Sequence, residues 1–104
     1  MKNDPLLYSV PETWELSEYH LQLGRNGAAT YLILSFVGDT GSVRLRLRGP
    51  YPLDATFAIT DDATGVRIFD ASAAQRVRQN IRVEFLTGEG QRCEFWAEAI
   101  ENDA

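Results

Sequence analysis

Cysteine and histidine are the scarcest chemically active residues of this 104-residue chain, with one of each. The single cysteine, Cys93, cannot form an internal disulfide, which fits a reducing compartment. One cysteine and one histidine cannot complete a structural zinc site within one chain, and we expect no metal and no cofactor. The longest apolar run, around residues 31–37, is far too short to span a bilayer.

The first residues lack the features of a secretory leader. Asp4 and Pro5 stand where a signal peptide needs an uninterrupted apolar stretch. Together with the absence of disulfides, this predicts a cytoplasmic protein that does not enter a membrane.

A surplus of positive charge is also missing, because the formal net charge is −5. General nucleic-acid binding relies on Lys and Arg neutralising phosphates, so we expect no nucleic-acid partner. An acidic protein suits a basic protein partner, because complementary fields speed their encounter. Seven of the ten basic residues nevertheless lie between Arg44 and Arg82, while acidic residues dominate before and after. The two sets either pair across one sheet or form a dipolar surface aimed at a partner.

Length and apolar content indicate one ordinary globular domain. The chain is 44 % apolar, and residues 1–104 are expected to form a single domain with its own core. Short runs of alternating apolar residues are cut by turn signals about every ten residues, which is typical of all-β proteins. The sequence therefore predicts an antiparallel sandwich, or a strongly twisted sheet, of about seven strands with one short helix.

The pattern also predicts where these elements lie. The run 29–37 is apolar on both faces, which favours a central strand. A short helix is expected over 71–78, with Asp70 accepting from its first backbone N–H groups and Val77 on its inner side. Residues 11–17 are expected to form a turn or a single helical turn. The seven expected strands are 18–23, 29–37, 43–48, 53–59, 66–69, 81–85 and 93–99.

Three arginines alternate with apolar residues in the segment 43–48. Because successive side chains of a strand point to opposite faces, Leu45 and Leu47 should lie inside and Arg44, Arg46 and Arg48 outside. Like charges side by side repel, so this arginine row needs acidic neighbours or an acidic partner. The row is either paired within the protein or a binding site for an anionic small molecule or acidic peptide.

A nucleophilic cysteine–histidine pair would require Cys93 and His20 to meet. His20 is expected on the polar face of its strand, whereas Cys93 belongs to an inward row with Phe95 and Ala97. A buried cysteine of this kind behaves as a small hydrophobe. We therefore assign no catalytic residue and predict that the protein is not an enzyme.

The last predicted strand carries an aromatic residue between two acids on its outward side, Glu94, Trp96 and Glu98. Trp96 is either covered by another segment or exposed. An exposed tryptophan flanked by carboxylates is the kind of group that anchors protein interfaces. These three residues are the candidate partner-binding surface.

Three segments share their layout with a known family: 18–23, the strand 43–48 with its following Gly49, and the closing hairpin formed by 81–85 and 93–101. In this layout the chain resembles small all-β immunity proteins of bacterial toxin–immunity systems, in the group called immunity protein 50-like. The resemblance implies a cytoplasmic protein-binding module that neutralises a toxin domain without catalysis of its own. The family's His-Asp pair is missing, since Leu21 follows His20, so the resemblance assigns no functional residue.

Overall fold

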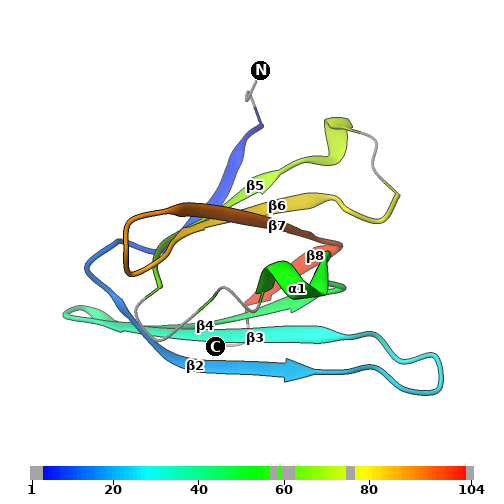
Figure 1. The fold of residues 1–104 in the computed structure, drawn as a ribbon, viewed down its shortest axis with the longest axis horizontal. Coiled ribbons are helices and arrows are strands. Elements are labelled where there is room, and N and C mark those ends of the chain that lie inside the picture. The colour runs from blue at the N-terminus through cyan, green and yellow to red at the C-terminus, as the bar shows by residue number, and fades with distance from the viewer. Residues whose placement is uncertain (1–3, 57–58, 60–62, 75–76, 103–104) are drawn as a thin grey trace.

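The computed structural model describes residues 4–56, 59, 63–74 and 77–102. Within these residues the strands form two antiparallel sheets of four strands each, stacked around a common core (Figure 1). The expected all-β sandwich is thus confirmed, with eight strands in the described part of the chain rather than about seven. No helix among the described residues is long and apolar enough to cross a membrane.

The two sheets draw their strands from different parts of the chain. The first sheet has the order β1-β5-β6-β7, and the second has the order β2-β3-β4-β8. The polypeptide crosses from the first sheet to the second between β1 and β2 and again between β7 and β8. The strands are β1 (Leu6–Ser9), β2 (Glu15–Gln22), β3 (Tyr31–Gly38), β4 (Gly41–Arg48), β5 (Thr64–Asp70), β6 (Ile81–Leu86), β7 (Arg92–Ala97) and β8 (Ala99–Asn102).

Alternation along the strands builds the core as the pattern predicts. Leu45 and Leu47 are completely buried, and the arginines that alternate with them, Arg44, Arg46 and Arg48, lie on the opposite, outer face. Strand β3 is central, because it pairs with β2 on one side and β4 on the other, and Ile33 on its outer face is buried too. Other enclosed core side chains in the described part of the chain include Leu32, Leu34, Phe36, Val66, Ile68, Val83, Phe85, Phe95 and Ala97.

The expected strand over 53–59 is wrong. Residues Leu53–Thr56 form a short helix, α1, in which the Ala55 N–H donates to the Pro52 carbonyl and the Thr56 hydroxyl donates to the Leu53 carbonyl. Proline cannot donate to a sheet ladder but is tolerated in the first turn of a helix, which explains the change. Phe57, part of the same expected strand, lies outside the described residues.

The expected helix over 71–78 is wrong as well. Only a 3₁₀ turn, Ser72–Ala74, forms in the described part of this segment, although the Asp70 carboxylate accepts from the Ser72 N–H as expected. The β5–β6 ladder continues to a hydrogen bond from Ala71 to Asn80, so the described residues 72–74 and 77–79 belong to the loop of a hairpin. Because this loop lies beyond the end of the sheet, Val77 is 83 % exposed rather than inside.

Candidate functional site

Every arginine of the predicted row has a carboxylate partner within the protein. Glu18 lies on β2, two strands away across β3, Glu101 lies on the adjacent strand β8, and Glu98 lies in the bend before β8, so the row is paired within the protein. The pairs, measured between nitrogen and carboxylate oxygen, are Arg44 with Glu18 at 3.1 Å, Arg46 with Glu101 at 3.5 Å and Arg48 with Glu98 at 3.3 Å.

Tyr31 adds a second set of contacts to the row. The guanidinium carbon of Arg46 lies 4.1 Å from the centre of the Tyr31 ring, and Arg48 donates to the Tyr31 hydroxyl at 3.1 Å. A cation over an aromatic face is attracted by the ring quadrupole. An incoming anion would have to compete with these contacts, so the arginine row is a weaker ligand site than its sequence indicates.

Glu18 lies at one end of this network. It accepts from the Ser35 hydroxyl at 2.6 Å and from Arg44, and these two hydrogen bonds hold the pKa of the Glu18 carboxyl below its ordinary range, with the Arg44 contribution the larger. Hydrogen bonds to the charged form of a carboxyl favour that form.

Replacing Arg44 by glutamine is expected to raise the pKa of Glu18. A depressed pKa in the folded state means that the carboxylate stabilises the fold above its unfolded pKa and that this contribution is lost as pH falls through the folded pKa. The stability advantage of the unaltered protein over Arg44→Gln should therefore shrink at pH values below about 4. Carboxyl-carbon NMR titration checks the shift, with Arg46→Gln as the control that leaves the Glu18 midpoint in place. An unmoved midpoint in Arg44→Gln would contradict the assignment.

The predicted surface of Glu94, Trp96 and Glu98 is divided in the structure. Glu94 and Trp96 share the outer face of β7, where Trp96 is half-buried and lies opposite Arg82. Glu98 lies beyond β7, at the bend between the two sheets, where its carboxylate pairs with Arg48. Glu94 in turn lies 3.8 Å from Arg82. Both acids have arginine partners inside the protein, which reduces their attraction for a basic partner.

Arg82 is the most deeply buried charged residue of the described chain, with only 2 % of its surface exposed. It projects from the outer face of the first sheet, but Phe69 covers it, its ring centre 4.5 Å from the guanidinium carbon. Its Nε donates to Glu84 at 3.2 Å and it also bonds the carboxylate of Asp4. The N-terminal segment therefore closes over an ion-pair network that fastens it to the sheet.

The structure does not bring His20 and Cys93 together. His20 is exposed on β2 in the second sheet, whereas Cys93 is half-buried on β7 in the first sheet and packs against the core. Among the described residues, no group of three or more His, Cys, Asp or Glu side chains is placed to hold a metal ion.

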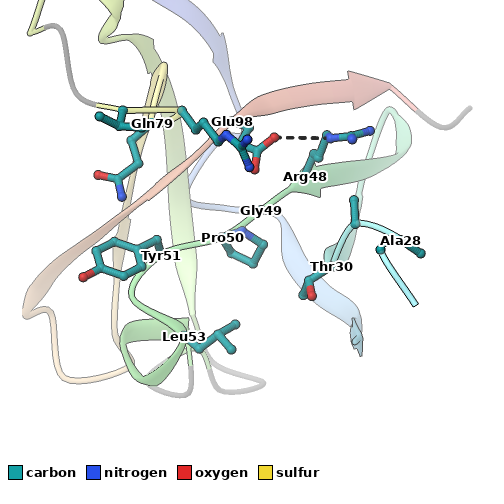
Figure 2. Close-up of a pocket in the computed structure, with 13 residues that line it drawn as sticks. Ala28, Thr30, Arg48, Gly49, Pro50, Tyr51, Leu53, Gln79 and Glu98 are labelled. Atoms are coloured by element: carbon teal, nitrogen blue, oxygen red, sulfur yellow. Dashed lines mark hydrogen bonds and ion pairs between the residues drawn. The ribbon is translucent and has the colours of Figure 1, made fainter. Parts of the chain in front are cut away.

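A hollow of about 470 Å³ lies where the β2–β3 loop, the segment after β4 and the β5–β6 loop meet. Figure 2 shows Tyr51 and Leu53 on one side of it, Ala28 and Thr30 on the other, and the Arg48–Glu98 ion pair between them and the last strand. A volume of this size falls in the range of binding pockets, roughly 300–1,000 Å³.

Backbone hydrogen bonds to both sheets fix the floor of the hollow. The Gly49 N–H donates to the Thr30 carbonyl at 2.8 Å, and Tyr51 and Trp96 exchange two backbone hydrogen bonds of 2.7 Å. Gly49 has a φ of +61°, and a Cβ there would lie 2.5 Å from the Glu98 carboxylate. The glycine thus permits both the turn and the close approach of Glu98, so this side of the hollow is held in place.

Exposed apolar side chains surround the hollow. Tyr51 is 54 % exposed, Leu53 38 % and Val77 83 %, whereas large apolar residues of the core are covered almost completely. The sequence pattern missed Leu53 and Val77 as surface residues, because it placed Leu53 in a strand and Val77 on the inner side of a helix. The two prolines around Tyr51 were the available signal that the strand ends there and that the following residues lie at the surface.

Comparison of the chain with protein-family models, with characterised proteins and with solved structures gives no significant match. Function is therefore argued from the geometry and charge of the surface itself.

Proposed function

We propose that this protein is a non-enzymatic protein-binding module whose partner docks at the hollow. The observation that carries the proposal is the gathering of Tyr51, Leu53 and Val77, all exposed, around one concave surface. Apolar side chains around a concavity are characteristic of interaction sites, and aromatic residues are enriched at interface centres.

The surroundings of the hollow favour this proposal over ligand binding at the arginine row. The row already has three carboxylates and the Tyr31 ring as partners, whereas the apolar rim of the hollow faces solvent. Covering apolar surface is the main source of free energy in most protein association. A partner can therefore cover more exposed apolar surface at the hollow than at the arginine row.

The specific form that we propose is an immunity-type inhibitor that occupies a toxin domain. The net charge of −5 suits a basic partner, and the acids that remain outside ion pairs in the described chain include Glu12, Glu15, Asp39 and Glu89. They lie in or beside the β1–β2, β3–β4 and β6–β7 turns, which gather at the left end of Figure 1. Their field would raise the frequency of encounter with a basic domain, without directing it to the hollow itself, and slower association at higher salt would report that contribution.

Loss of the Val77 side chain is expected to abolish capture of the partner. The experiment is affinity purification from the native organism with the unaltered chain, Val77→Ser and Val37→Ser. Val37 is a matched control, because it is also exposed but lies beside the β3–β4 turn at the other end of the molecule. Truncating an interface anchor costs about 2 kcal/mol or more, roughly a thirtyfold loss of affinity.

The expected result is one dominant protein retained by the unaltered chain and by Val37→Ser and lost with Val77→Ser. For the inhibitor form, expression of that protein alone should arrest growth, and co-expression of this chain should restore it. Equal retention by both variants would remove the hollow as the contact surface. Growth unaffected by the captured protein would exclude the toxin-inhibitor form while keeping the binding module.

A further inference from the structure

The local charge of the hollow has the opposite sign to that of the whole chain. Its charged lining residues in the described structure are Arg48, Arg78 and Glu98. Arg48 and Glu98 neutralise each other through their 3.3 Å ion pair. Arg78 forms no ion pair within the described residues, so the hollow retains one uncompensated positive charge in a protein of net charge −5.

Charged groups just outside the lining leave this balance unchanged. Arg25 lies in the β2–β3 loop shortly before the residues that line the hollow, and Asp54 follows the lining residue Leu53 in α1. Both are exposed and neither forms an ion pair within the described part of the chain. These two charges offset each other, and the Asp70 carboxylate at the end of β5, which accepts from the Ser72 N–H and hydroxyl, lies outside the lining, so the surplus of the lining itself is that of Arg78.

Arg78 also lies next to the apolar rim of the hollow. It follows Val77, the most exposed large apolar residue among those that the structure describes, and its φ of 61° turns the chain at this point of the β5–β6 loop. The hollow therefore combines an apolar rim of Tyr51, Leu53 and Val77 with a guanidinium that lacks a carboxylate partner among the described residues.

From this combination we infer that the hollow receives a short, extended, acidic segment of a partner protein. A carboxylate of the segment pairs with Arg78, and an apolar side chain two positions away packs on the rim. Alternate side chains of an extended segment point to the same face, so both can enter the hollow together. The inference rests on the proposed protein-binding function and names the chemistry of the contact.

An acidic contact segment is compatible with a partner that is basic as a whole. The field of the whole chain steers approach, while groups in contact within the hollow select the segment that enters it. At physiological ionic strength the charges at the far end of the molecule are screened over about 8 Å, so they contribute little at the hollow.

Titration of the ¹⁵N-labelled protein with three blocked six-residue peptides tests the inference. In the first peptide glutamate and phenylalanine stand two positions apart with serine between them, so that both lie on one face of the extended chain; in the second lysine replaces glutamate, and in the third serine replaces phenylalanine. We expect only the first to shift the amide signals of Tyr51, Val77 and Arg78 in a saturable manner. Arg78→Glu should weaken its binding about fivefold or more, because an exposed attraction is replaced by repulsion.

Arg92→Glu is the matched control, because Arg92 is also exposed but lies beside the β6–β7 turn, away from the hollow. It should leave the affinity for the glutamate peptide within about twofold. A lysine peptide that binds as tightly as the glutamate peptide, shifts confined to other residues, or absence of saturable binding by the glutamate peptide would each overturn the acidic-segment inference. The Val77→Ser capture experiment would then still decide the protein-binding function by itself.

Discussion

Replacing Arg82 by methionine is expected to lower the free energy of unfolding by about 3–5 kcal/mol, because one partner of a buried ion pair is removed and the other remains. Glu84, itself 8 % exposed, would lose the guanidinium that donates to it at 3.2 Å, and Asp4 would lose the group that fastens the N-terminal segment. Small domains are stable by only about 5–15 kcal/mol, so this loss would be readily visible. Urea unfolding followed by circular dichroism measures it.

Two further variants test whether the loss of stability comes from the burial of Arg82 or would follow from the removal of any arginine near Glu84. Arg92→Ala removes an arginine that lies 3.9 Å from the same Glu84 but is largely exposed, and should change stability by no more than about 1 kcal/mol. Adding Glu84→Gln to Arg82→Met should restore part of the loss, because it removes a nearly buried carboxylate that then keeps only the more distant Arg67 and Arg92, each at 3.9 Å. Equal effects of Arg82→Met and Arg92→Ala would show that burial of Arg82 contributes nothing.

Leu45→Ala should destabilise the protein by about 2–5 kcal/mol, since a completely buried leucine is cut back within a close-packed core. Strand β4 is hydrogen-bonded to β3 on one side and to β8 on the other, which limits how far the backbone can move to fill the space. Chemical denaturation monitored by tryptophan fluorescence gives the difference in free energy.

Arg46→Ala serves as the control for Leu45→Ala, because the two residues are neighbours on β4 that face opposite ways. Its exposed pair with Glu101 is worth about 0–1 kcal/mol, so stability should barely change. A loss below about 0.5 kcal/mol for Leu45→Ala would mean that the strand register is wrong, since a shift of one residue exchanges the two faces.

Alternation in the sequence was sufficient to predict the class of fold and most of its strands. Leu45 and Leu47 lie inside and the arginines outside because the period of two leaves a strand one way to bury apolar surface. The errors fall at 53–56 and in the described part of the helix expected over 71–78, where local hydrogen bonding decides. Pro52 begins a helical turn, and the extension of the β5–β6 ladder to Ala71 and Asn80 turns an expected helix into a loop.

The candidate site was harder to predict because it depends on contacts between distant residues. The pairing of Glu98 with Arg48, 50 residues away, divides the expected surface around Trp96. Burial of Arg82 depends on Asp4, 78 residues away, and no local sequence pattern predicts this burial. Exposure of Val77 follows from where the hairpin ladder ends, which periodicity alone does not specify.

Hydrogen–deuterium exchange of the chain, alone and in complex with the protein that it captures, shows whether the partner docks at the hollow. Exchange reports the local opening and covering of backbone amides. If the partner docks at the hollow, exchange should slow in residues 27–30, 49–53 and 77–79, and change little in the turns at the other end. Slowing confined to residues 39–40 and 88–90, with the hollow unaffected, would contradict the account.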